Sequence, residues 1–200
     1  MKYRSYNELL FGKQFDKDEL PFDHVWKFFS QFVSEGSQSK LRLSDVLHDV
    51  CGYRNVANML CQLRFNLLAK DRELILDCKL QILDVGDSTC SNMKYHCDGF
   101  SSAQQLGYSL IILDESADNT GIDKNGTEFA RDRLKFPAMT HFTSSLMEKL
   151  HDNITFSWDP DSGISIPTRT IINYDSTFPH RGIIVNQPTR RIFLRLHEEA

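Results

Sequence analysis

Three side chains in this 200-residue sequence have the types and spacing of a metal site: His96, Asp98 and His180. One residue separates His96 from Asp98, so on a β-strand the two side chains point to the same face. His180, from a distant strand, would supply the third ligand on one face of an octahedral ion. A pair of neutral imidazoles and one carboxylate holds Fe(II) and leaves three positions open. The pattern therefore predicts a mononuclear iron site.

Each of these residues also has a structural interpretation. A His-x-Asp pair can arise by chance in a chain with seven histidines, and it needs structural context before it indicates chemistry. His180 could be a loop histidine bonded to backbone, and Asp98 could cap the turn that it forms with Gly99. The order of the elements favours the metal site. The His-x-Asp stretch follows a long alternating strand, and an arginine follows His180 by ten or eleven residues.

The elements that must position these residues are helices first and strands afterwards. Apolar spacings of three and four predict helices over about 25–33, 44–50 and 55–69. From Arg72 onward the apolar period changes to two, which predicts a long strand with one buried face over 74–82. Further strands are expected over 106–113, 164–174, 180–185 and 190–196. This order predicts an α+β, mainly β fold: a double-stranded β-helix, or jelly roll, buttressed by N-terminal helices.

Length and composition place the chain among globular proteins with a single domain of 1–200. We expect residues 1–70 to form a mostly helical support layer, and 72–200 a jelly-roll core with an insert at about 115–160. The net charge of −4 and the absence of a Lys/Arg run give no nucleic-acid signal. The polar start of the chain and the lack of long apolar stretches predict no export signal and no membrane span. Five cysteines without CxxC spacing then indicate a cytoplasmic location.

The segments YHCDGF, LGYSLIILDES and INYDSTFPHRGIIVNQPTRRIFLRL resemble the Fe(II)/2-oxoglutarate-dependent dioxygenases. The resemblance covers about residues 72–114 and 164–197. It implies that His96, Asp98 and His180 bind Fe(II), with 2-oxoglutarate as cosubstrate and O2 as oxidant. It also implies that the arginine before the last strand binds the distal (C5) carboxylate of 2-oxoglutarate, as a planar guanidinium can do with two hydrogen bonds.

Two neighbouring arginines compete for the carboxylate. Alternation puts Arg190 in phase with Ile192 and Leu194, whereas Arg191 shares its face with Phe193. If the apolar face points inward, Arg190 is the cosubstrate residue and Arg191 is a surface charge. Tyr108, in phase with Leu110 and Ile112, could add a hydroxyl to the same carboxylate or be a core tyrosine bonded elsewhere.

The resemblance implies an oxygenase, with hydroxylation as the default reaction, on a small molecule or a protein side chain. Two other interpretations stay open: a non-catalytic jelly-roll binding module, and a cupin-type metal dioxygenase that does not use 2-oxoglutarate. The sequence indicates neither the substrate nor the oligomeric state.

Overall fold

The structure, a computed structural model, describes residues 9–65, 67, 73–90, 96, 107–116, 127–130, 163–175 and 178–198. These residues hold three helices: α1 (Phe22–Phe29), α2 (Leu43–His48) and α3 (Arg54–Phe65). They also hold nine strands: β1 (Leu10–Gln14), β2 (Gln38–Arg42), β3 (Leu74–Leu83), β4 (Gly107–Asp114), β5 (Glu128–Phe129), β6 (Ile164–Ser165), β7 (Thr170–Asp175), β8 (His180–Arg181) and β9 (Thr189–Glu198). No helix of this described part is long and apolar enough to cross a membrane.

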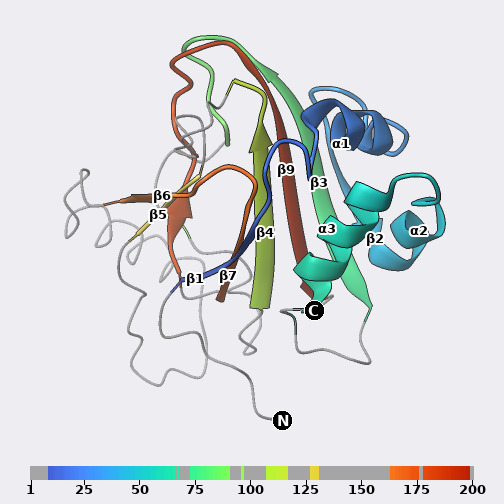
Figure 1. Ribbon diagram of the computed structural model, residues 1–200. Helices are drawn as coiled ribbons and strands as arrows, with labels where there is room; N and C mark the ends of the chain where they lie inside the picture. Colours follow the sequence, from blue (N-terminus) through green and yellow to red (C-terminus); the bar gives the residue numbers. More distant parts are fainter. Residues whose placement is uncertain are drawn as a thin grey trace, which may run out of the picture.

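The strands form two antiparallel sheets (Figure 1). The larger sheet has the order β1-β7-β4-β9-β3-β2, and the smaller has the order β6-β5-β8. β3 and β9 pair over their whole length, from Leu74 opposite Glu198 to Leu83 opposite Thr189. The mainly β, antiparallel arrangement with few helices is jelly-roll-like, which confirms the fold class expected from the sequence.

The larger sheet is covered on both faces. Helices α1, α2 and α3 lie on its outer face (Figure 1), where their apolar side chains pack against those of β3, β4 and β9 in the main core. On the inner face, β4 and β7 contribute to a smaller apolar cluster that also contains residues of the smaller sheet: Tyr108, Leu110, Ile112, Phe129, Ile166, Ile172, Tyr174 and Phe178. The inner faces of β3 and β9 carry mainly polar side chains, although Phe193 of β9 packs against the edge of this cluster.

The N-terminal segment does more than cover the sheet. Its three helices form the outer layer, as the sequence suggested. The same segment also supplies both edges of the larger sheet, because β1 pairs with β7 and β2 pairs with β3. Of the insert expected at 115–160, residues 127–130 contain β5, and 117–126 and 131–160 lie outside the described residues.

The strand expected over 164–174 is broken in two. β6 belongs to the smaller sheet and β7 to the larger one, so the chain changes sheet between them. Pro167 has no N–H to donate to a ladder, and Arg169 adopts a positive φ of 58°, which is unusual for a residue with a side chain. After β7 the chain returns to the smaller sheet, where β8, with His180, pairs with β5.

Candidate active site

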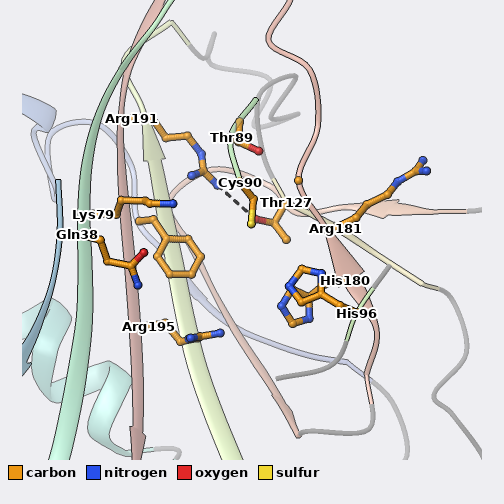
Figure 2. A pocket seen from close by; sticks show the side chains of 12 residues that line it. Gln38, Lys79, Thr89, Cys90, His96, Thr127, His180, Arg181, Arg191 and Arg195 are labelled. Carbon is orange, nitrogen blue, oxygen red and sulfur yellow. Dashed lines mark hydrogen bonds between the residues drawn. The ribbon is translucent and has the colours of Figure 1, made fainter. Parts of the chain in front are cut away.

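A cavity of about 230 Å³ lies between the inner face of the larger sheet and the segment around β8. Figure 2 shows Arg191, Lys79 and Arg195 on one wall and His96 and His180 on the other. Residues from β2, β3, β8 and β9 and from the connecting segments line it: Gln38, Lys79, Thr89, Cys90, His96, Thr127, His180, Arg181, Gly182, Arg191, Phe193 and Arg195. The cavity is therefore rich in basic side chains and contains two imidazoles.

The two predicted histidine ligands are brought together by the backbone. The His96 N–H donates to the His180 carbonyl, and the His180 N–H donates to the His96 carbonyl, each at 2.9 Å. This bridge puts the two rings side by side, with their centroids 4.6 Å apart. The structure thus places these distant histidines side by side, and their role as metal ligands stays a prediction. Asp98, the third predicted ligand, lies outside the described residues, and its role stays a prediction.

His180 is held as a neutral imidazole. It is buried between Phe129, whose ring stacks on it at 5.2 Å, and Tyr174, which contacts it edge-on at 5.7 Å. Burial lowers the pKa of His180 to about 4, against a smaller opposing effect of the Phe178 carbonyl. That carbonyl lies 3.2 Å from Nδ1 and can only accept, so Nδ1 carries the proton and Nε2 the lone pair.

A neutral ring whose N–H is anchored on a backbone carbonyl is the state in which histidine binds metals. The two adjacent imidazoles thus fit a divalent ion of the iron type. No group of three possible metal ligands occurs among the described residues, so a complete ligand set would need a residue beyond them, as Asp98 is.

Arg191 is the most deeply buried cation of the cavity. Only 1% of its surface is exposed, and its two terminal nitrogens donate to Gln81 Oε1 at 2.6 Å and Thr127 Oγ1 at 3.2 Å. The Gln81 amide is fixed in turn, because it donates to the Thr89 carbonyl at 3.2 Å. Gln81 and Thr127 thus fix the plane of this guanidinium at the buried end of the cavity, in a geometry that suits a carboxylate.

Arg190, the arginine favoured from the sequence, lies on the opposite face of β9 from Arg191. The expectation that Arg190 faces the cavity is therefore wrong. It lies on the helix side of the sheet, where it donates to Glu115 and Asp23 at 2.7 Å and contacts the rings of Phe22 and Trp26. The alternation itself was right, since Arg190 shares its face with Ile192 and the following leucines. The error was to assume that the apolar face is the cavity face. The helices make it the outer face.

Tyr108 lies on the inner face, in phase with Leu110 and Ile112 as predicted, but it does not line the cavity. Its ring stacks on Tyr174 at 5.1 Å and lies under the guanidinium of Arg195 at 5.2 Å. Its role toward a carboxylate stays a prediction. The hydroxyl group that contacts the buried arginine is that of Thr127.

Sequence reasoning missed the polar residues of β3. Lys79 and Gln81 alternate with the core leucines, so a strand with one buried face would place them on the solvent side. Lys79 lines the cavity, and Gln81, which is 8% exposed, lies on the same face of β3 and accepts from Arg191 of the cavity wall. One signal was present: Arg191 and Arg195 alternate in the same way on the last strand. Two strands with charged alternate positions, neither at a sheet edge, indicate a polar cavity.

The turn after β8 and the Cys90 segment approach each other closely at the cavity rim. A Cβ atom on Gly182 would lie 2.7 Å from Cys90 Cβ and 2.9 Å from its backbone nitrogen. Thr89 ties the two segments together, since its N–H donates to the Ile183 carbonyl at 3.1 Å and its Oγ1 accepts from the Ile183 N–H at 3.0 Å. A side chain at position 182 would push Cys90 and Thr89 away from the cavity.

Comparison with known proteins gives a likeness of fold. No protein-family model and no curated protein sequence matches the chain. Among solved structures, the chain is similar to EvdO2 from Micromonospora carbonacea var. aurantiaca in complex with 2-oxoglutarate. The TM-score is 0.52 and the identity 12%, over 96% of this chain and 87% of that one. A second EvdO2 structure, at 12% identity and a TM-score of 0.48, covers 94% of this chain and 93% of that one. At this identity the likeness shows the jelly-roll fold alone.

Proposed function

We propose that this chain is an Fe(II)- and 2-oxoglutarate-dependent oxygenase, with hydroxylation as its default reaction. The observation that carries the proposal is the position of Arg191: a buried guanidinium faces two adjacent imidazoles across one cavity. The distal carboxylate of 2-oxoglutarate would pair with the guanidinium. Its keto acid group would chelate a metal held by the two imidazoles. The 2-oxoglutarate complex of the structural neighbour supports this choice of cosubstrate.

His96 and His180, together with Asp98, would hold the Fe(II). When bound, the ion would supply the redox chemistry that couples O2 and the decarboxylation of 2-oxoglutarate to the oxidation of a substrate C–H bond. The chain's own contribution is to orient the imidazoles and to keep that of His180 neutral. Burial keeps His180 neutral, and the bond to the Phe178 carbonyl orients its ring.

Arg191 would bind the C5 carboxylate of 2-oxoglutarate. Gln81 and Thr127 fix the plane of its guanidinium, so little side-chain freedom is lost when a carboxylate binds. The Thr127 hydroxyl can rotate and donate to the same carboxylate while it still accepts from Arg191. Burial strengthens both interactions, because the local dielectric is low.

The test is turnover of 2-oxoglutarate to succinate by the full chain with Fe(II), ascorbate and O2, which such oxygenases carry out slowly without substrate. We expect succinate from the wild type and none from His96→Ala, His180→Ala or Asp98→Ala. Fe(II) should also raise the melting temperature of the wild type but not that of the histidine variants, which separates loss of metal from loss of fold.

Two outcomes would contradict the proposal. No turnover and no Fe(II)-dependent thermal shift would identify a non-catalytic binding module. A cupin-type dioxygenase would be identified if the chain bound Fe(II) and oxidised a substrate without 2-oxoglutarate, and if Arg191→Met kept this activity.

A further inference from the structure

The basic side chains of the cavity differ in how their charge is balanced. Arg181 forms two hydrogen bonds to the Glu128 carboxylate, at 2.8 and 3.1 Å. Arg195 donates to Asp77 Oδ2 at 2.6 and 3.0 Å. Lys79 has no carboxylate within ion-pair distance in the part of the chain that the structure describes. Its ammonium is therefore a cavity charge that the described protein groups leave uncompensated.

Lys79 also lies among charges of its own sign. Burial lowers its pKa, and the Arg191 and Arg195 guanidiniums lower it further, against an opposing effect of Cys90. Placing a half-buried ammonium between two guanidiniums costs folding free energy. An anion bound in the cavity would remove that cost, and the site is electrostatically prepared for one.

The position of Lys79 separates it from the cosubstrate end. Arg191 and Gln81 form a buried end, with 1% and 8% exposure. Lys79 lies two residues before Gln81 on β3, which is about 6.6 Å along the strand. It is paired with the exposed Gln38 of the edge strand β2. On β9, the Phe193 ring lies between the two guanidiniums, 5.7 Å from Arg191 and 5.8 Å from Arg195. An apolar surface thus divides the cavity floor into a closed end and an open end.

We propose that the substrate of this oxygenase is an organic anion whose carboxylate or phosphate binds Lys79, with Gln38 as a hydrogen-bond donor, at the open end of the cavity. This inference rests on the proposed function, because it assigns the closed end, at Arg191, to 2-oxoglutarate. The anionic group of the substrate would lie over the edge of Phe193, and the rest of the molecule would point toward the two histidines.

The test measures binding to the full chain loaded with Fe(II) and saturating 2-oxoglutarate under anaerobic conditions. Three probes of similar shape are titrated calorimetrically: benzoate, phenyl phosphate and neutral benzamide. We expect one of the anions to bind at least about tenfold more tightly than benzamide, which also decides between carboxylate and phosphate. In Lys79→Met and Lys79→Gln this preference should disappear, while the affinity for 2-oxoglutarate stays within about twofold of wild type.

Lys40→Met is the matched control. Lys40 is an exposed lysine on β2, opposite Asp77 and outside the cavity lining, so this variant should keep the wild-type preference. Weaker 2-oxoglutarate binding in Lys79→Met would overturn the inference by assigning Lys79 to the cosubstrate. Equal binding of benzoate, phenyl phosphate and benzamide, with 2-oxoglutarate still bound through Arg191, would overturn it while the proposed function stands. Absence of 2-oxoglutarate binding in the wild type would overturn both.

Discussion

The two faces of the β3–β9 pair are both buried, yet they have opposite chemistry. The outer face, under the helices, is apolar: Leu76, Cys78, Leu80, Ile192, Leu194 and Leu196. The inner face, at the cavity, is polar: Asp77, Lys79, Gln81, Arg191 and Arg195, with Phe193 among them. The outer face stabilises the fold by removing apolar surface from water. The inner face must hold its charges with hydrogen bonds and ion pairs, because a buried charge is costly without partners.

This difference shows where to look for a site in a sheet that is covered on both sides. The side chains that are hardest to bury are the ones that fold stability alone would not select. Buried polarity in the middle of a sheet therefore indicates binding, and buried apolarity indicates packing.

Arg191→Met should have the largest effect, on cosubstrate binding. Removing a buried, hydrogen-bonded charge partner of a carboxylate costs ~4 kcal/mol, or about a thousandfold in affinity. Anaerobic calorimetry with Fe(II) and 2-oxoglutarate measures this. An affinity within tenfold of wild type would remove Arg191 from the cosubstrate site.

Leu194→Ala should destabilise the fold by about 3 kcal/mol, because it leaves a cavity at a position with 0% exposure in the main core. Phe193→Leu, one residue away on the cavity face, should cost less than about 1.5 kcal/mol. Urea unfolding followed by circular dichroism compares the two variants. A larger loss for the Phe193 variant would show that the inner face contributes more to stability than the outer one.

Asp77→Asn should cost about 1–2 kcal/mol at neutral pH, since the carboxylate accepts from Arg195 and lies 3.4 Å from His197. Burial alone would raise the pKa of Asp77, but His197 and Arg195 together hold it below the usual 3.8. Because the pKa of Asp77 is lower in the folded than in the unfolded state, its ionised carboxylate stabilises the fold fully above pH ~4. This stabilisation is lost as the pH falls through the pKa of the folded state. The stability gap between wild type and Asp77→Asn should thus be constant from pH 8 to 5 and shrink at pH 3. A gap that grows on acidification would contradict this sign.

Arg190→Met should have the smallest effect. Its ion pairs with Glu115 and Asp23 are partly exposed to solvent, and such pairs contribute ~1 kcal/mol or less. We expect unchanged 2-oxoglutarate affinity, which makes this variant the control for Arg191→Met. If Arg190→Met and not Arg191→Met abolished cosubstrate binding, the comparison of the two faces would be reversed.

Much of the fold could be predicted from sequence, because period-two alternation reports directly on paired strands. The bounds of β3, β4 and β9 lie within a residue or two of those expected. The adjacency of His96 and His180 could also be predicted, since the metal site expected from the sequence requires it. By contrast, β5 and β6 contain two residues each, too short to have a period, and their pairing depends on distant segments.

The choice between the two arginines could not be made from alternation. The period-two pattern indicates which side chains share a face of the strand. It does not indicate which of the two faces encloses the cavity. That depends on where the helices pack, which is a tertiary property. The polar positions of β3 were misread for the same reason: Lys79 and Gln81 look like a solvated face until a second sheet is placed over them.

The position of β9 in the sheet has a consequence for how the chain folds while it is being synthesised. Its residues 189–198 are the last described strand in chain order, yet they separate β4 from β3 in the middle of the larger sheet. Until the ribosome has released them, the strands on either side form two incomplete sheets with open edges, which are prone to pair with other chains. Productive folding has to wait for this segment, and a nascent chain stalled before it would be a natural client for chaperones.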